Sequence, residues 1–218
     1  MEATEGNPVI AEVKVHSPKY GDILGDRDPI EILRRYEYAG ATGISYITAD
    51  EFKGDKELLR KICSETDLPV LRKDFITEKE DIEITAEYGA SAVLLITSLL
   101  GDDLPEFVDI ALESNLEPLV EVHDEQEIEL ANETDTPLIG INNRDISRME
   151  MDDGTVSRTE ELAELVRDDV TLISESGIRD IADMRRALDL ADAVLIGTAF
   201  MKSKNPGSTL KKFVDSKR

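Results

Sequence analysis

Residues 91–122, SAVLLITSLLGDDLPEFVDIALESNLEPLVEV, decide the fold class of this chain. The segment opens with the apolar run Ala92–Ile96, continues through an amphipathic stretch, and ends with a second strand-like run at 117–122. An apolar run without alternation is typical of a parallel strand that helices cover, and an amphipathic stretch is typical of a helix. The segment therefore predicts a strand, a helix and a second, parallel strand.

Runs of the same kind recur along the sequence and predict eight strands. Successive runs start 20 to 34 residues apart, which suits one strand, one helix and two loops. The eight runs are 9–14, 43–48, 69–75, 91–97, 117–122, 137–143, 171–176 and 193–200. Eight such repeats predict an α/β fold, a single (β/α)8 TIM barrel domain over 1–218 with a short N-terminal extension at 1–8.

Helix boundaries support the same fold. Asp28 and Asp124 are predicted N-caps, and Glu127, three residues after Asp124, completes the pattern of a capping box. Gly40 and Gly89 are predicted to close two of the helices. The alternative fold, an open doubly wound sheet, would show a glycine-rich G-x-G-x-x-G turn after its first strand. The chain instead continues VHSPKYG there, which favours the barrel.

Composition and charge exclude several classes of protein. The 218 residues carry 25 Lys and Arg against 48 Asp and Glu, a net charge of −23, which disfavours a nucleic-acid or anionic membrane surface. One cysteine, Cys63, and two histidines exclude a disulfide framework and a zinc site of ordinary composition. No apolar run approaches the roughly 18 residues of a membrane span. We expect a soluble cytoplasmic protein without nucleic-acid or membrane partners, whose anionic ligands need a local cationic pocket.

Polar residues gather where five of the predicted strands end, and catalytic groups of a barrel sit at the C-terminal ends of its strands. One charged residue there is as often a solvated loop entry, but five strands together indicate a site. Because side chains alternate along a strand, Glu12 and Lys14 are predicted to share one side. Buried lysines need carboxylates or an anionic ligand. The candidate site residues are Glu12, Lys14, Lys73, Glu121, Asn142, Arg144 and Glu175.

The last two repeats carry a second signal. Glycines follow the strands at Gly177 and Gly197, in the tetrapeptides ESGI at 175–178 and IGTA at 196–199. The loops after the seventh and eighth strands are where barrels commonly hold phosphate, on backbone N–H groups that glycine leaves open. The pair predicts a phosphorylated substrate.

Five motifs, in chain order, resemble those of indole-3-glycerol phosphate synthase. The resemblance covers about residues 9–213 and is carried by IAEVK at 10–14 with Ser17 and Pro18, LRKDF at 71–75, GINNRD at 140–145, ESGI and IGTA. That family closes the ring of 1-(2-carboxyphenylamino)-1-deoxyribulose 5-phosphate and removes carbon dioxide and water to give indole-3-glycerol phosphate, a step of tryptophan biosynthesis. The resemblance implies a carboxy-lyase that uses no cofactor and no metal.

The resemblance also implies roles for residues. Lys73 is the expected general acid of ring closure and Glu121 the acid/base group of dehydration, acting in successive steps rather than as a structural ion pair. Lys14, Glu12 and Asn142 complete the expected catalytic set. The expected substrate contacts are Arg144 at the anthranilate end, Glu175 and Ser176 along the wall, Ser17, Gly177, Gly197 and Thr198 at the phosphate, and Phe75.

Other residues receive structural interpretations, and other functions stay open. Core packing is favoured over substrate stacking for Phe52 and Phe75, no catalytic role is expected for His16 or His123, and Cys63 is expected to be a small core residue.

An isomerase of phosphoribosylanthranilate is an alternative, but it needs a Cys/Asp pair at the mouth. A non-catalytic sugar-phosphate-binding barrel is the other alternative, and a monomer is the expected state. The family usually has a longer helical segment before its first strand.

Overall fold

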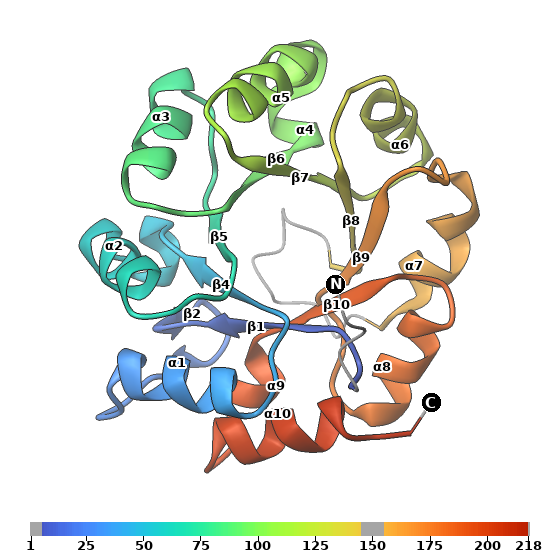
Figure 1. Ribbon diagram of the computed structural model, residues 1–218. Helices are drawn as coiled ribbons and strands as arrows, with labels where there is room; N and C mark the ends of the chain where they lie inside the picture. The colour runs from blue at the N-terminus through green and yellow to red at the C-terminus, as the bar shows by residue number, and fades with distance from the viewer. Residues whose placement is uncertain (1–5, 145–154, 218) are drawn as a thin grey trace.

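The computed structural model describes residues 6–144 and 155–217. Within these residues eight parallel strands close into a barrel, in the order β1-β10-β9-β8-β7-β6-β5-β4, and β4 pairs back with β1 (Figure 1). The predicted (β/α)8 fold is confirmed. The barrel strands are β1 Val9–Val13, β4 Gly43–Ile47, β5 Val70–Lys73, β6 Ala92–Ile96, β7 Glu117–Val122, β8 Leu138–Asn142, β9 Thr171–Glu175 and β10 Ala193–Ile196.

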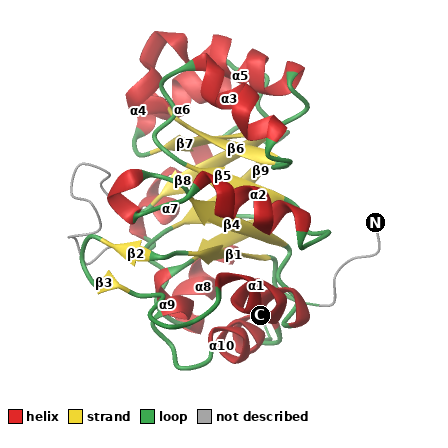
Figure 2. Cartoon of the chain, turned by 90° about the vertical axis from the view of Figure 1, so that its left-hand side faces the viewer, coloured by secondary structure: helices red, strands yellow, loops and turns green. Residues whose placement is uncertain are grey.

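Helices surround the barrel, and a two-stranded antiparallel hairpin, β2 His16–Ser17 with β3 Gly21–Asp22, lies outside the closed sheet in the loop after β1 (Figure 2). Among the described residues, no helix combines the length and the apolar character that a membrane span requires. The helices are α1 Pro29–Tyr38, α2 Lys56–Ser64, α3 Lys79–Glu87, α4 Thr97–Leu100, α5 Leu104–Glu113, α6 Glu125–Asn132, α7 Ser157–Leu162, α8 Ile181–Leu188, α9 Thr198–Met201 and α10 Pro206–Val214, with short 3₁₀ turns η1 Asp50–Phe52, η2 Gly101–Asp103 and η4 Ala163–Leu165.

The predicted helix boundaries are confirmed. Asp28 caps α1 by accepting from Ile30 N, and Asp124 caps α6 by accepting from Glu127 N at 3.0 Å. Glu127 departs from a standard capping box, because its carboxylate accepts from the backbone N–H of His123 and not from that of Asp124. Gly40 and Gly89 follow α1 and α3 with φ of 90° and 82°, a left-handed conformation that glycine adopts without strain.

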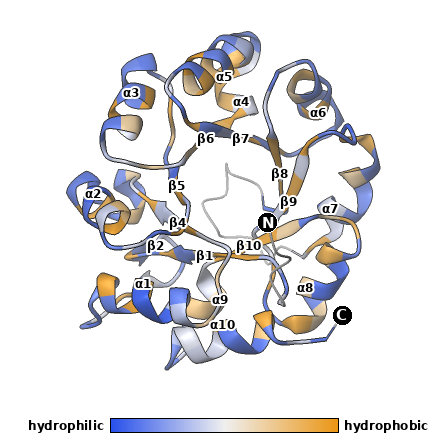
Figure 3. Ribbon diagram, in the orientation of Figure 1, coloured by the Kyte–Doolittle hydropathy of each residue, from blue (hydrophilic) through white to orange (hydrophobic). Residues whose placement is uncertain are grey.

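Apolar side chains fill the barrel interior and the space between sheet and helices. Leu71, Leu94, Leu119 and Leu195 belong to the inner cluster, and two larger clusters lie between strands and helices. The outer helix faces are mainly hydrophilic, as the net charge requires (Figure 3). Because the interior is packed, polar side chains that face inward can lie only at the ends of the strands.

The predicted strand at 193–200 is wrong in its second half. β10 ends at Ile196, Gly197 follows, and α9 begins at Thr198. Phe200 then packs edge-on against Phe213 of α10, which buries it on the helix side. The apolar run continues past Ile196 because it includes the end of β10 and the start of α9, and both are buried. An apolar pattern alone does not separate a buried strand from a short buried helix.

Candidate active site

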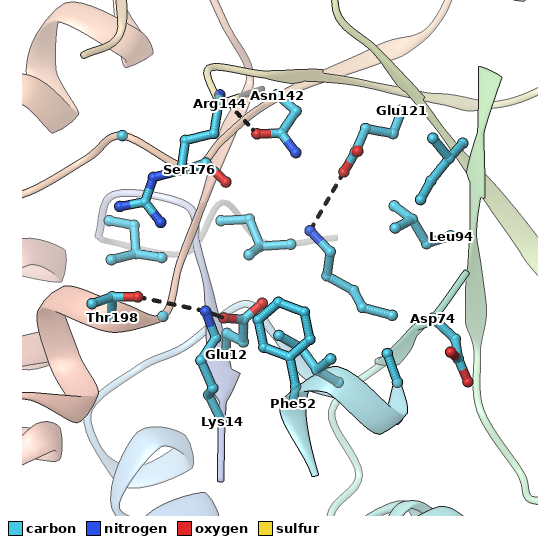
Figure 4. A pocket seen from close by; sticks show the side chains of 18 of the residues that line it. Glu12, Lys14, Phe52, Asp74, Leu94, Glu121, Asn142, Arg144, Ser176 and Thr198 are labelled. Carbon is cyan, nitrogen blue, oxygen red and sulfur yellow. Dashed lines mark hydrogen bonds and ion pairs between the residues drawn. The ribbon is translucent and has the colours of Figure 1, made fainter. Parts of the chain in front are cut away.

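A pocket opens at the C-terminal end of the barrel, and every barrel strand or the loop that follows it contributes to its lining (Figure 4). The predicted residues that the structure brings together there are Glu12, Lys14, Lys73, Phe75, Glu121, Asn142, Arg144, Ser176, Gly177, Gly197 and Thr198. The lining also includes residues that the sequence reasoning did not select: Ile47, Ala49, Phe52, Asp74, Leu94, Ile96, Ile178, Leu195 and Ile196.

Lys73 lies between two buried carboxylates. Its Nζ is 2.6 Å from Glu175 Oε2 and 3.6 Å from Glu121 Oε2, and all three side chains are at most 12% exposed. Lys73 and Glu121 are thus in ionic contact, and both line the pocket. Their expected roles in successive steps stay a prediction. Glu175 is fully buried and pairs with Lys73 instead of lining the wall.

The protein shifts the pKa values of this cluster in different directions. Burial alone would lower the pKa of Lys73, but the carboxylates of Glu175, Glu121 and Glu12 raise it well above its ordinary value. Burial raises the pKa of Glu175 to about 7, against the opposing effect of Lys73. Burial would also raise the pKa of Glu121, but Lys73 and His123 hold it below its ordinary value. Glu121 is thus kept ionised, whereas Glu175 titrates near neutral pH. Two neighbouring carboxyl groups with different pKa values can serve as a base and as an acid.

Lys14 and Glu12 point to the same side of β1, as alternation predicted. Lys14 Nζ lies 3.1 Å from Glu12 Oε1 and 3.5 Å from Thr198 Oγ1, and 5.3 Å from the centre of the Phe52 ring (Figure 4). The core-packing interpretation is wrong for Phe52, a half-buried ring that lines the pocket and belongs to no core cluster among the described residues. It is right in part for Phe75, whose half-buried ring packs against the inner cluster and also lines the pocket. Phe52 closes the 3₁₀ turn η1 directly after β4, so the chain turns its ring over the mouth.

Asn142 and Arg144 also share one side and both line the pocket. Asn142 Oδ1 accepts from Arg144 N at 3.0 Å, and the Arg158 guanidinium donates to the carbonyl of Arg144 at 3.1 Å. Asp145, the last residue of the GINNRD motif, lies outside the described residues.

Asn143 is a structural residue that the sequence reasoning did not single out. Its Nδ2 donates to the carbonyl of Glu175 at 2.9 Å, and its Oδ1 accepts from Thr159 N at 3.0 Å. These bonds join the ends of β8 and β9 to α7. They fix the loop that begins at Ser176 and Gly177, which have φ of 63° and 70°.

The two predicted phosphate glycines are tightly enclosed on one side. A Cβ on Gly197 would lie 2.1 Å from Glu12 Oε1, and a Cβ on Gly177 would lie 2.8 Å from the carbonyl oxygen of Thr155. Larger residues there would displace other parts of the site, so they do not test phosphate binding alone. Ser17 is not among the lining residues: it is buried in β2 and its Oγ accepts from Tyr20 N at 3.3 Å.

Of the remaining candidates, Cys63 and His16 lie away from the pocket, whereas His123 contacts one of its lining residues. Cys63 is half-buried on α2 against the core, and burial raises the pKa of its thiol to about 11, as a core residue would show. His16 lies in the β2–β3 hairpin and does not line the pocket. His123 contacts Glu121, which the sequence reasoning did not expect. Within residues 6–144 and 155–217, no group of three or more His, Cys, Asp or Glu side chains is arranged to hold a metal ion.

Comparison with known proteins gives one consistent result. A family model described as indole-3-glycerol phosphate synthase matches residues 1–213. The indole-3-glycerol phosphate synthase of Pyrococcus furiosus is 62% identical over 211 residues, which cover 96% of this chain and 92% of that protein. That of Thermococcus kodakarensis is 60% identical over 216 residues, 99% of this chain and 95% of that protein. The tryptophan biosynthesis protein TrpCD of Archaeoglobus fulgidus is 50% identical over 199 residues, 91% of this chain and 36% of that longer protein.

Proposed function

The chain belongs to the indole-3-glycerol phosphate synthase family, and we propose on that premise that its barrel mouth carries out the family reaction. The enzyme is a carboxy-lyase that converts 1-(2-carboxyphenylamino)-1-deoxyribulose 5-phosphate into indole-3-glycerol phosphate. The observation that carries the proposal is the buried ammonium of Lys73 between Glu121 and Glu175, inside a pocket that also holds Arg144 and the glycine loops. Ring closure needs a proton donor at the ketone oxygen and dehydration needs acid and base groups, which this cluster supplies.

Lys73 donates a proton to the ketone oxygen as the ring carbon attacks the ketone carbon. Its ammonium is fully charged at neutral pH, because three carboxylates raise its pKa. Loss of carbon dioxide then restores the aromatic ring, and Glu175, with a pKa of about 7 and 2.6 Å from Lys73, returns a proton to the lysine. In the last step the recharged Lys73 protonates the hydroxyl, which leaves as water, and Glu121 accepts the proton that the neighbouring carbon loses.

The rest of the pocket suits the two ends of the substrate. Asn142 and Arg144 hold the anthranilate end, and the side chains of Leu94, Ile96 and Phe75 give its ring an apolar surface. Lys14, Thr198 and the backbone of Gly177 and Gly197 hold the phosphate end. No residue in this scheme requires a metal or an organic cofactor.

Fluorescence tests the reaction directly. The chain, incubated with the carboxyphenylamino substrate and a chelator, should produce the fluorescence of indole-3-glycerol phosphate. Binding of substrate without product would favour a non-catalytic sugar-phosphate binder. Turnover of phosphoribosylanthranilate would favour the isomerase, which the position of Cys63 on α2, outside the pocket, makes the weaker alternative.

Thr198→Val tests the phosphate assignment without a new steric clash. Valine keeps the shape of threonine and removes the hydroxyl beside Lys14. A hydrogen bond to a charged group contributes about 1.5–3 kcal/mol, so we expect KM to rise about tenfold or more while kcat changes little. Inorganic phosphate should inhibit the variant less strongly by a similar factor.

The matched control for that prediction is Thr209→Val on α10, whose hydroxyl bonds to the Asn205 carbonyl away from the pocket. It should leave KM unchanged. An unchanged KM in Thr198→Val would remove Thr198 from the phosphate site.

We further propose that the chain acts as one barrel domain, as a monomer, in the cytoplasm. The excess of 48 acidic over 25 basic residues supports a small-molecule substrate rather than a nucleic acid or a membrane.

A further inference from the structure

His123 lies between two carboxylates at the edge of the pocket. It follows the last residue of β7, and its Nε2 is 3.4 Å from Glu121 Oε1 while its Nδ1 is 3.0 Å from Glu127 Oε2. The side chains of His123 and Glu121 are 11% and 2% exposed. The ring is therefore a largely buried link between a residue of the reaction cluster and the first turn of α6.

The start of α6 fixes the orientation of the ring. Glu127 accepts from the backbone N–H of His123 at 2.7 Å as well as from the ring, and its own backbone N–H is held by the N-cap residue Asp124. One carboxylate oxygen thus holds both the main chain and the ring of His123. With Nδ1 held on Glu127, the opposite nitrogen faces Glu121.

The partners also fix the protonation of the ring. An ionised carboxylate only accepts hydrogen bonds, so Glu127 and Glu121 each favour an N–H on the nitrogen that faces them. A neutral imidazole carries one N–H and would turn a lone pair toward one of the two carboxylates. Only the imidazolium turns an N–H to both carboxylates: it hydrogen-bonds to Glu127 and makes an ion pair with Glu121 at 3.4 Å, a contact in which Nε2 and Oε1 form no hydrogen bond.

We propose that His123 is a positioning residue for Glu121: an imidazolium clamped by Glu127 that keeps the Glu121 carboxylate ionised and oriented toward the pocket. The proposal rests on the proposed function in one respect, which is that Glu121 is an acid/base group of the reaction. In this proposal His123 and Glu127, which do not line the pocket, act on the reaction through Glu121.

The charges around this pair favour the imidazolium. Burial lowers the pKa of His123, but Glu121 and Glu127 raise it to about 9, so the ring is charged at neutral pH. Beyond these two carboxylates, an outer hollow beside His123 is lined by charged groups of α6 and α7, and the inner cluster faces Glu121 from the strands. The groups concerned are Asp124, Glu125, Arg158 and Glu161 outside, and Lys73, Glu175, Glu12 and Asn142 inside.

The consequence for Glu121 has a definite sign. Glu121 is held ionised by two cations, Lys73 and His123, and Lys73 lies closer to Glu175 than to Glu121. Removal of the His123 charge leaves Glu121 with a shared lysine. Its pKa then rises, because an opposite charge within about 4–6 Å typically lowers a carboxyl pKa by about 1–3 units.

An NMR titration tests the clamp without any reference to activity. The chain holds two histidines, so His16→Gln leaves the His123 ring signal alone in the spectrum. We expect His123 to titrate near pH 9 and to shift downward by about one unit or more in Glu127→Gln and in Glu121→Gln. Titration near the ordinary 6.5 in all of these proteins would overturn the proposal, whatever reaction the chain catalyses.

Kinetics test the effect on Glu121. In His123→Gln, which keeps a neutral amide near the carboxylate, we expect kcat to fall about tenfold with little change in KM, as one part of the roughly 10²–10⁴-fold effect of a positioned acid/base group. The acid limb of the kcat/KM profile should move up by about one pH unit. Glu127→Gln should show the same changes in smaller degree.

The control is Glu129→Gln, which changes an exposed carboxylate of the same helix that lines neither the pocket nor the hollow beside His123, and it should leave both rate and profile unchanged. Because His123 acts through Glu121, the double variant His123→Gln with Glu121→Gln should be no slower than Glu121→Gln alone. A wild-type pH profile in His123→Gln, or losses that multiply in the double variant, would overturn the proposal.

Discussion

Lys73→Met is expected to lower kcat by about 10²–10⁴-fold, because it removes the side chain that we propose as the proton donor of ring closure. The substitution also affects stability, because Lys73 pairs with the buried carboxylates of Glu121 and Glu175. Without it, the pKa of Glu175 rises beyond about 7 and the carboxyl takes up a proton. A carboxyl whose pKa is higher in the folded than in the unfolded state costs stability as pH rises above the unfolded value.

The rate and the stability of this variant therefore respond differently to pH. We expect the loss of kcat at every pH. The loss of the Lys73–Glu121 pair lowers Tm throughout this range, and the deficit should grow between about pH 6 and about pH 8, where Glu175 ionises beside Lys73 but stays protonated without it. Lys79→Met, which removes a half-exposed lysine paired with Glu106 on the outside, is the matched control and should keep the wild-type rate. A Lys73→Met enzyme that turns over normally would show that Lys73 is structural. It would also overturn the proposal that Lys73, Glu121 and Glu175 form the catalytic cluster.

Strand periodicity was enough to predict the fold and to place several charged residues at the pocket. The apolar run Ala92–Ile96 and its counterparts identify strands because both faces are buried, and each barrel strand was located within a few residues. Alternation then placed Glu12 with Lys14, and Asn142 with Arg144, on the pocket side. These predictions depend only on local geometry, which the sequence carries directly.

Predictions that depend on partners distant in the sequence were less successful. Ser17 follows β1 in a family motif, but the β2–β3 hairpin buries it away from the lining. His123 was set aside as a loop residue, although its place two residues after Glu121 hinted at a shared side. Its link to Glu127 depends on how α6 begins, which no strand pattern describes.

The position of Arg72 in the sequence suggests the wrong side of the sheet. It precedes Lys73 in the motif LRKDF, and a charged residue at a strand end suggests the barrel mouth. Because side chains alternate, Arg72 points to the helix side instead, where its side chain is completely buried. Its guanidinium donates to Thr48, to Asp74, and to both Asp81 and Thr85 of α3.

These bonds give Arg72 an indirect role at the pocket. Asp74 lines the pocket, and its carboxylate accepts from Arg72 and Thr48 while holding the backbone N–H of Phe75. The buried arginine thus joins the end of β5, the start of α3 and one wall of the site. The motif at 71–75 thus has two faces, with Lys73 toward the pocket and Arg72 toward the helix.

Arg72→Met is accordingly expected to lower the free energy of unfolding by about 3–5 kcal/mol, the typical result of removing one partner from a buried ion pair. Methionine fills much of the space but removes the guanidinium from Asp81, Asp74 and the Thr85 hydroxyl. Asp81 then keeps the half-exposed Lys56 as a cation. Asp74 keeps two neutral donors, the Thr48 hydroxyl and the backbone N–H of Phe75. Arg34→Met, which breaks an exposed pair with Glu65, should cost at most about 1 kcal/mol. Urea denaturation of the two variants measures both values.

The double variant Arg72→Met with Asp81→Asn separates the loss of a charge pair from the loss of packing. If the loss of the guanidinium charge beside Asp81 causes part of the damage, the second substitution should recover part of the lost stability, because a neutral amide needs a cationic partner less than a carboxylate does. A single variant no less stable than Arg34→Met would show that Arg72 does not hold the β5–α3 connection. In that case the wall formed by Asp74 and Phe75 must be fixed by contacts other than this guanidinium.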